Sequence, residues 1–550
     1  MFKRNPAGKQ LSLTDPYLNY PKYVREALHN SWAEHFFSSI FTNIDENRFA
    51  ALYSQNYSRP NAPVNMIVGL LILKELNGWT DEDTIAALYF DYRVQYALGI
   101  SDFDRERICI NTLSNFRARL YEYSEKERRD LLGEEISHLT EALIHISGMD
   151  TKLARQDSMQ ISANCKRMGR LELVYTVNAN MVEVLKREAP GVIPETCRHY
   201  LEDKDKSNQI YRLPKEDVPD KTAQLLKESV TLYHAVPAEL QSTQAFKNLS
   251  RLLEEQTNDD NTPKDEKKQS ASNLQNPSEP DATYRNKGNK PSIGYVMNIV
   301  EARDDIKALS LIIYAERQPN IVSDSELGQN ALDGNLKGVA TMVSDGAYYS
   351  LGMVEKAEKK GIALSFSALN GRPAPEGKLG ANQFAIDPET ELITACPGGF
   401  APVTASRDHK KELFNAKFDK ENCSPCPFRD SCIIKEQKRF NAVIITKTKL
   451  VADHYRSRLG TAEHQALGDF RAGVEGIPSV LRRVYSIDAL PVRGLIRTRV
   501  WDHFKIIAYN FKAVYRYFRR CGASPLSFLF YSLLLSFNFR LRCTQACYSR

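Results

Sequence analysis

The sequence predicts an α/β protein, in which a mixed sheet with flanking helices follows an all-helical N-terminal region. Residues 1–150 place apolar side chains at helical spacing. Residues 293–302 and 308–317 are two β-rich runs around a polar turn, which is the pattern of a hairpin. A helical pattern at 323–336 then leads into a short apolar strand at 339–343. With 550 residues the chain is too long for one core, so several domains are expected.

The N-terminal region contains three helical signals. Apolar residues repeat at helical spacing over 62–78, and the Thr and Asp that bound 80–83 are typical of a capping box that starts a second helix. A third helix begins near residue 111 and carries Arg117 and Arg119, with Ser and Asn, on one face. Two short helices followed by such a helix are typical of a DNA-binding helix-turn-helix. A helical bundle with an ordinary solvated face explains the same pattern.

The middle of the chain is less informative. Residues 171–232 have the periodicity of helices but show no legible function. Residues 256–292 are poor in apolar side chains, and Asn, Asp, Lys, Ser, Gln and Pro dominate. Such a stretch cannot bury enough apolar surface to offset the entropy of ordering it. We therefore predict a flexible linker there.

The net charge of +6 is unevenly distributed. Residues 482–550 hold 13 Lys or Arg residues against Asp488 and Asp502, a net charge of +11, so the remainder of the chain is acidic. A basic segment of this kind favours a polyanionic partner such as nucleic acid. A solvated basic face explains the composition equally well.

Targeting signals and cysteine usage favour the cytoplasm. The N-terminus lacks the apolar core of a signal peptide. The apolar run at 526–539 contains polar residues and is too short to span a bilayer, so no membrane partner is expected. The ten cysteines are scattered except for one cluster, which favours reduced thiols.

That cluster consists of Cys396, Cys423, Cys426 and Cys432. Four thiolates can close a tetrahedral Zn²⁺ site, and the C-x₂-C spacing of the middle pair suits one. The other spacings are looser than a paired C-x₂-C framework. The sequence is therefore compatible with two interpretations of the cluster, a structural zinc site and simple buried thiols.

Two Asp residues stand out on predicted strands. Asp157 lies in the middle of the strand-like segment 151–164, where β propensity disfavours it. Asp345 follows the strand at 339–343, and ligands of open α/β sheets bind at the carboxyl ends of strands. A solvent-facing Asp and a turn residue beside Gly346 are the simpler explanations.

The third acidic residue lies in a helical segment at 461–485. Arg471 and Glu475 are four residues apart on one face, and Arg482 lies near that face two turns later. Pro478 cannot donate a backbone hydrogen bond, so the helix should kink or restart there. A surface salt bridge is the simpler explanation of the Arg–Glu pair.

If the fold gathers Asp157, Asp345 and Glu475, they form an all-oxygen site. Such a site suits Mg²⁺ or Mn²⁺, and two such ions support phosphodiester cleavage and strand transfer. Without a cation, three carboxylates would repel one another and raise their own pKa values. Arg471 and Arg482 could then hold phosphates.

The chain resembles bacterial insertion-sequence transposases with a DDE catalytic domain, of the IS1182-like group within the IS5/IS4-like set. The segments that carry the resemblance are the run at 58–100, RQDSMQISANCKRMGRLEL at 155–173, SDGAY at 344–348, CPGG with CSPCPFRDSC between 396 and 432, and FRAGVEGIPSVLRR at 470–483. The resemblance implies an RNase H-like catalytic core with Asp157, Asp345 and Glu475 as its metal-binding triad.

The resemblance also bears on the helix around Glu475. Related transposases often show Tyr, Arg, Glu and Lys at fixed spacing. Arg471 and Glu475 match that pattern, whereas Gly468 takes the Tyr position and Arg482 the Lys position. The residues expected to contact DNA are Arg117, Arg119, Arg471, Arg482 and Arg483.

The expected domain order follows from the motifs and the resemblance together. It comprises a helical DNA-binding domain at 1–150, a first catalytic strand with a helical insertion at 151–255, a disordered linker at 256–292, an RNase H-like core at 293–384, a Cys-rich insertion at 385–445, a catalytic helix region at 446–520 and a tail at 521–550.

The predicted function is that of a transposase that binds the inverted-repeat ends of its own insertion sequence, cleaves them with a divalent metal ion and joins the 3′-OH ends to target DNA. Pairing of two ends implies a homodimer in the synaptic complex, in a cytoplasmic, nucleoid-associated protein. A catalytically inactive, transposase-derived DNA-binding protein or repressor is the main alternative. A zinc-stabilised nuclease and a structural scaffold are two further ones.

Overall fold

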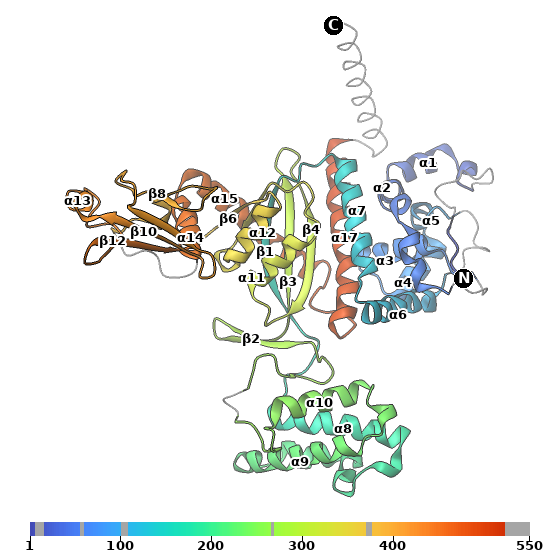
Figure 1. Ribbon diagram of the computed structural model, residues 1–550. Helices are drawn as coiled ribbons and strands as arrows, with labels where there is room; N and C mark the ends of the chain where they lie inside the picture. Colours follow the sequence, from blue (N-terminus) through green and yellow to red (C-terminus); the bar gives the residue numbers. More distant parts are fainter. Residues whose placement is uncertain (6–15, 55–59, 101–107, 266–268, 370–376, 523–550) are drawn as a thin grey trace.

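The structure, a computed structural model, describes residues 1–5, 16–54, 60–100, 108–265, 269–369 and 377–522 (Figure 1). It is a mixed α/β protein in which a helical N-terminal region precedes a mixed sheet, as predicted. The apolar run predicted at 526–539 lies outside the described residues, as does all of the predicted tail beyond residue 522.

The N-terminal region is helical. Its α-helices are α1 (Lys22–His29), α2 (Trp32–Ser39), α3 (Val64–Asn77), α4 (Asp81–Phe90), α5 (Tyr92–Ala97), α6 (Ile110–Glu127) and α7 (Leu131–Ser147). The three predicted helices are confirmed as α3, α4 and α6. Gly78 ends α3 in the left-handed conformation, with φ +70°, and Thr80 and Asp83 form the predicted capping box of α4.

The central sheet has the order β2-β3-β1-β5-β6, and β4 also pairs with β3. Its strands are β1 (Leu153–Ser162), β2 (Thr283–Lys287), β3 (Lys290–Asp304), β4 (Leu309–Pro319), β5 (Thr341–Ser344) and β6 (Ala363–Phe366). The predicted hairpin is confirmed as the antiparallel pair β3–β4. β1 pairs antiparallel with β3 but parallel with β5, and β5 pairs parallel with β6. The sheet is therefore mixed.

Helices cover both faces of this sheet. One face packs on α11 (Asp324–Asp333) and α12 (Leu351–Lys359), which share a core with β1, β3, β5 and β6. The other face packs against α17 (Leu495–Cys521), which lies along β4 (Figure 1). The N-terminal helices bury their apolar side chains in the same core as α17 and this second face. The expected boundary at residue 150 therefore separates two segments that share one hydrophobic core.

Buried ion pairs fasten α17 into that core. Arg317 of β4 donates two hydrogen bonds of 2.7 Å to the carboxylate of Asp502, and both side chains are buried. Lys505 pairs with Glu75 of α3, where both side chains are again buried. The basic C-terminal segment is thus used partly inside the molecule, because its Lys505 neutralises a buried carboxylate rather than facing solvent.

The helical insertion folds separately from the sheet. It contains α8 (Arg170–Glu188), α9 (Val218–Ala235) and α10 (Gln244–Gln256), which enclose a core of their own (Figure 1).

The prediction of a disordered linker at 256–292 is wrong for the residues that the structure describes. Leu274 is buried in the core of the insertion, and the segment ends in β2 and the first residues of β3. Arg251 donates hydrogen bonds to the carbonyl oxygens of Ser272 and Pro280, and Asn276 donates to that of Lys166. Hydrogen bonds to polar groups order a segment whose apolar content alone predicts disorder.

The cysteine-containing region forms a second, smaller sheet with the order β11-β12-β10-β9. Its strands are β9 (Thr404–Asp408), β10 (Leu413–Asp419), β11 (Lys435–Glu436) and β12 (Phe440–Thr446), with α13 (Lys420–Cys423) between β10 and β11 and a small pair formed by β7 (Ala385–Ile386) and β8 (Ile393–Ala395). α14 (Lys447–Arg458) leads back to the central sheet. No described helix is long and apolar enough to cross a membrane.

Candidate active site

The parallel pairing of β1 with β5 brings Asp157 and Asp345 to neighbouring positions. The register runs from Leu153 opposite Thr341 to Arg155 opposite Val343. Asp157 follows two residues later on β1, and Asp345 follows two residues after Val343, directly after the end of β5. Because the strands run in the same direction, the two carboxylates meet at one edge, where the pairing with β5 ends.

Asp345 opens a tight turn rather than a regular helix. β5 ends at Ser344, and the 3₁₀ turn Gly346–Tyr348 follows Asp345. A Cβ added to Gly346 would stand 2.7 Å from the carbonyl carbon of Ala368, so only glycine lets this backbone pass. The Asp-Gly sequence is thus a structural requirement of the turn, and it leaves the Asp345 side chain 47% exposed.

The late helical segment crosses these strands and is broken in the middle. α15 (Ala462–Ala472) packs against β1, β5 and β6, the 3₁₀ turn η12 (Gly473–Glu475) follows, and α16 (Gly476–Arg483) begins directly afterwards. Pro478 is the third residue of α16, where its missing N–H has no intrahelical acceptor to lose. The predicted restart is confirmed, and it falls just before the proline.

Arg471 of α15 contacts both Asp residues. Its Nη2 lies 3.4 Å from Asp157 Oδ1 and 3.5 Å from Asp345 Oδ2. Its Nε is buried and has no hydrogen-bond partner within the described part of the chain. The guanidinium therefore sits between the two carboxylates as a shared counter-charge.

Asp157 carries the electrostatic strain of the cluster. Burial raises its pKa, and the charges of Asp345 and Glu475 raise it further, while Arg471 and the backbone N–H of Ser158 oppose this. Glu475 lies at the end of η12 and is exposed. Arg471 thus contacts Asp157 and Asp345, and Glu475 lies near enough for its charge to act on Asp157; we call these four residues the carboxylate cluster. In the described part of the chain its three carboxylates are not grouped so that they hold a metal ion as they stand.

The other predicted DNA-contacting arginines lie apart from this cluster. Arg482 donates to the carbonyl oxygen of Gln160, 2.6 Å away, and pairs with Asp488. Arg483 is exposed and bonds to Ser479 on its own helix. Both fit a role at the rim of the site rather than at its centre.

On the predicted recognition helix, only one arginine faces solvent. Arg119 is exposed, beside the ring of Tyr53. Arg117 is buried, pairs with Asp81 of α4 and lies 5.3 Å from the ring centroid of Trp501. The assignment of Arg117 as a DNA contact is therefore wrong, because its charge is used to fasten α6 to α4 and α17.

Sequence reasoning missed Arg155, which lies on the same face of β1 as Asp157. It forms a buried pair with Glu301 of β3 and donates a 2.6 Å hydrogen bond to the carbonyl oxygen of Phe470. The signal in the sequence was the spacing of two residues, which places both side chains on one face of a strand.

The four clustered cysteines line one pocket in the second sheet, together with Phe400, Phe418 and Ile434. Burial raises the pKa of the Cys432 thiol, and Cys396 and Cys423 are close enough to raise it further. Across the described ranges, however, no three or more His, Cys, Asp or Glu side chains are grouped so that they hold a metal ion as they stand.

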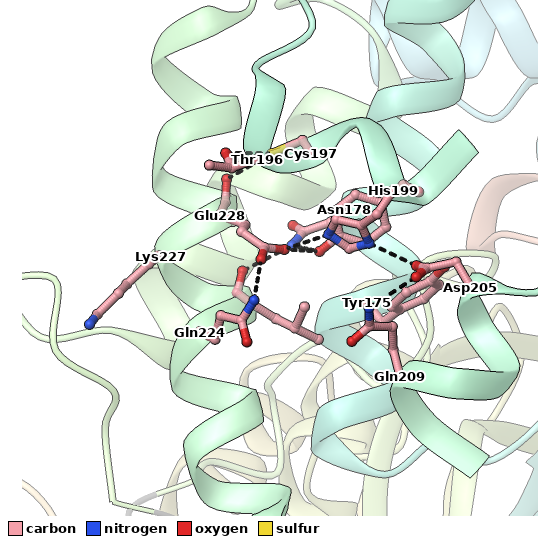
Figure 2. Close-up of polar contacts among 12 residues, drawn as sticks. Tyr175, Asn178, Thr196, Cys197, His199, Asp205, Gln209, Gln224, Lys227 and Glu228 are labelled. Carbon is pink, nitrogen blue, oxygen red and sulfur yellow. Dashed lines mark hydrogen bonds and ion pairs between the residues drawn. The ribbon is translucent and has the colours of Figure 1, made fainter. Parts of the chain in front are cut away.

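A second cluster of titratable groups lies in the helical insertion. Figure 2 shows His199 between two carboxylates, with Nδ1 2.8 Å from Asp205 and Nε2 3.2 Å from Glu228. Asp205 also accepts from Tyr175, and Glu228 from Tyr200, both at 2.7 Å. We call this the insertion cluster. Its carboxylates are each satisfied by several donors, as in a structural network.

Two family models match the chain. A transposase DDE domain matches residues 395–515, and a transposase domain of the DUF772 family matches residues 26–119. The first match contains Glu475 and the four clustered cysteines but neither Asp157 nor Asp345. No curated protein and no solved structure matches the chain.

The two matches indicate a transposase function and a nuclease or transposase enzyme in general. DDE transposases generally use divalent metal ions, and the family implies DNA binding. This pair of matches is typical of IS1182-family transposases. The resemblance to insertion-sequence DDE transposases of the IS1182-like group, which the motifs predicted, is thereby confirmed.

Proposed function

We propose that this chain is a DDE-type transposase that cleaves DNA at a divalent metal site formed by Asp157, Asp345 and Glu475. It would bind the terminal inverted repeats of its insertion sequence, cleave phosphodiester bonds there and join the 3′-OH ends to target DNA. The observation that carries the proposal is the parallel register of β1 and β5, which puts two carboxylates side by side beneath the segment that bears the third.

We also propose an RNase H-like fold for the central domain. Its support is a mixed sheet in which β1 lies centrally between an antiparallel hairpin and two parallel strands, with helices on both faces. This arrangement places the first Asp on a central strand and the second on its parallel neighbour.

The donor set fits Mg²⁺ or Mn²⁺. Arg471 contacts Asp157 and Asp345, and Glu475 adds a third carboxylate nearby, so the cluster carries an excess of negative charge when all three are ionised; burial also raises the pKa of Asp157. Hard divalent cations prefer carboxylate and water oxygens. When bound, Mg²⁺ would activate a water or the 3′-hydroxyl of the DNA as the nucleophile and stabilise the leaving oxygen.

The chain's own residues would orient the DNA around that chemistry. Arg471 pairs with Asp157 and Asp345 in the absence of DNA, and a guanidinium can also bind phosphate in two-pronged fashion. Asp157 is held by the backbone N–H of Ser158 at 2.8 Å, which fixes its carboxylate. Arg119, Arg482 and Arg483 would contact the DNA backbone outside the centre.

The proposal implies partners and a location. Double-stranded DNA is the partner, as inverted-repeat ends and as target, and binding should weaken steeply as salt rises. Two ends must be held together, so we propose a homodimer in the synaptic complex. We further propose a cytoplasmic, nucleoid-associated location, which follows from the DNA substrate.

The test is cleavage and joining of DNA that carries the element's ends, in Mg²⁺, by wild type, Asp345→Asn and Asp469→Asn. Asp469 is an exposed carboxylate on α15 and serves as the matched control. We expect wild type and the control to nick the ends and form joined products, and Asp345→Asn to bind the same DNA without cutting it. Equal cutting by all three would remove Asp345 from the site.

The same experiment separates the alternatives. Salt-sensitive binding to the ends without cutting by any variant would indicate an inactive, repressor-like protein. Cutting without joined products would indicate a nuclease. Failure to bind DNA at all would favour a scaffold built on the cysteine module.

We propose in addition that Cys396, Cys423, Cys426 and Cys432 hold a structural Zn²⁺. The support is that all four line one pocket, although their thiols would have to turn toward a common centre. Metal analysis of protein purified without chelator should find about one zinc ion per chain. Cys426→Ser should lose it and Cys165→Ser, which lies outside the pocket, should keep it.

A further inference from the structure

The segment that carries Glu475 is tied to the strand that carries Asp157 by one buried side chain, Arg155. Arg155 and Asp157 project from the same face of β1, two residues apart. Arg155 also stands directly opposite Glu301 in the antiparallel register of β1 and β3. The two side chains form an ion pair and are 6% and 1% exposed. The guanidinium is therefore held in place by the sheet.

The free arm of this guanidinium reaches the end of α15. Nη1 donates a 2.6 Å hydrogen bond to the carbonyl oxygen of Phe470, and Cζ lies 5.1 Å from the centroid of the Phe470 ring. The last carbonyls of a helix lack intrahelical donors and carry the negative end of the helix dipole. A buried cation there both caps α15 and fixes its height above the sheet.

The backbone of Gly473 also packs against the Arg155 guanidinium. A Cβ at this position would overlap Nη1 of Arg155 and stand 3.1 Å from Cζ. The backbone of η12 thus rests on the guanidinium, and any side chain would lift it. Arg471, which contacts Asp157 and Asp345, lies just before this contact, and Glu475 lies two residues after it.

We infer that Arg155 is a positioning residue that sets the distance between Glu475 and the two Asp residues, by clamping the α15–α16 junction to β1. The inference rests on the proposed metal site. Because the clamp starts from the same strand as Asp157, any shift of the junction is a shift relative to the first metal-binding carboxylate. The end of the clamp at Glu301 is buried, so solvent screens the ion pair little, whereas the end at Phe470 is only partly buried.

Two substitutions break the clamp without leaving Glu301 unpaired. Gly473→Ala pushes the junction off the guanidinium and leaves the Arg155–Glu301 pair intact. Arg155→Lys keeps a charge opposite Glu301, but an ammonium on a narrower head cannot serve Glu301 and the Phe470 carbonyl together. Gly476→Ala is the matched control, because a Cβ there meets nothing within 4 Å and the position adjoins Glu475.

The experiment is Mn²⁺ binding to the full chain, with thermal unfolding and DNA binding measured on the same samples. Supporting shells of metal sites typically change affinity by about 10-fold to 100-fold. We expect Gly473→Ala and Arg155→Lys to weaken Mn²⁺ binding by about 10-fold at unchanged DNA affinity. Their cleavage rate should recover as the Mn²⁺ concentration is raised, and Gly476→Ala should match wild type. A variant that fails to fold would show a lowered unfolding midpoint instead.

Two different results would overturn the inference, one by removing the role of the clamp and the other by removing the metal site itself. If wild type binds Mn²⁺ through the cluster but Gly473→Ala and Arg155→Lys bind it equally well, the clamp does not position Glu475 and the proposed function stands. If Asp157→Asn and Glu475→Gln bind Mn²⁺ like wild type, the metal site itself is wrong, and the clamp has no catalytic role.

Discussion

The carboxylate cluster and the insertion cluster contain similar groups in opposite electrostatic states. In the insertion, each carboxylate accepts hydrogen bonds from several donors, and those bonds hold the pKa of Asp205 below its ordinary value of 3.8 in spite of its burial. In the carboxylate cluster, burial and two neighbouring carboxylates instead raise the pKa of Asp157. A network that satisfies itself stabilises the fold. One that leaves charge unbalanced suits a bound cation, which is what we propose for the carboxylate cluster.

The largest expected effect separates the two clusters by activity. Glu475→Gln should lower the rate of end cleavage by at least ~100-fold, because it removes a ligand from ions that supply several kcal/mol of transition-state stabilisation. Glu228→Gln, the same change in the insertion cluster, should leave the rate per folded molecule unchanged. A single-turnover cleavage assay measures both. Equal losses in the two variants would erase the functional distinction.

The next largest expected effect separates the two clusters by their contribution to stability. His199→Phe keeps the ring beside Tyr200 but removes both ring nitrogens that lie between Asp205 and Glu228. The variant should lose about 2 kcal/mol of stability, because two buried carboxylates lose their shared hydrogen-bond partner at a site where His199 is partly exposed. Hydrogen exchange of α8 and α9 reports it locally. Unchanged protection of both helices would show that the insertion cluster does not hold them.

A pH series tests the insertion cluster directly. The lowered pKa of Asp205 means that its ionised form contributes stability above pH 3.8, and that this contribution is lost as pH falls through the lowered pKa. Asp205→Asn should therefore destabilise the insertion at pH 7, and the difference from wild type should shrink as pH approaches 3. Denaturant unfolding of the two proteins at each pH measures this. A difference that grows on acidification would have the wrong sign.

The smallest expected effect is a gain in stability, whereas the substitutions in the insertion cluster cause losses. The raised pKa of Asp157 means that its ionised form costs stability in metal-free protein at pH 7. Asp157→Asn should raise the free energy of unfolding in the presence of a chelator by up to ~1 kcal/mol. Added Mn²⁺ should stabilise wild type but not the variant. If the variant is less stable than wild type without metal, Asp157 belongs with the satisfied carboxylates.

Much of the fold was predictable because its signals are local. The capping box at Thr80, the hairpin around residues 302–308 and the strand before Asp345 follow from propensity and period alone. The linker prediction failed because apolar content does not count hydrogen bonds made over distance, such as those from Arg251.

The sequence singled out the acidic residues of the proposed site, but not the residues that support them. Asp157 stood out as an Asp in mid-strand, whereas Arg155 looks like any arginine until the register with Glu301 is known. Likewise, helical spacing places Arg117 on the face of Leu113 and Leu120, but its buried ion pair could not be read from the sequence. Its partners Asp81 and Trp501 arrive from other elements.

The central claim, that Asp157, Asp345 and Glu475 share one divalent metal ion site, is tested most directly by iron-directed backbone cleavage. Fe²⁺ in place of Mg²⁺, with ascorbate and peroxide, cuts the polypeptide beside the site where it is bound. We predict cuts near residues 157, 345 and 475 together, suppressed by excess Mg²⁺ and lost in Asp345→Asn. Cuts confined to the cysteine pocket, or cuts near residue 157 that persist in Asp345→Asn, would contradict the account.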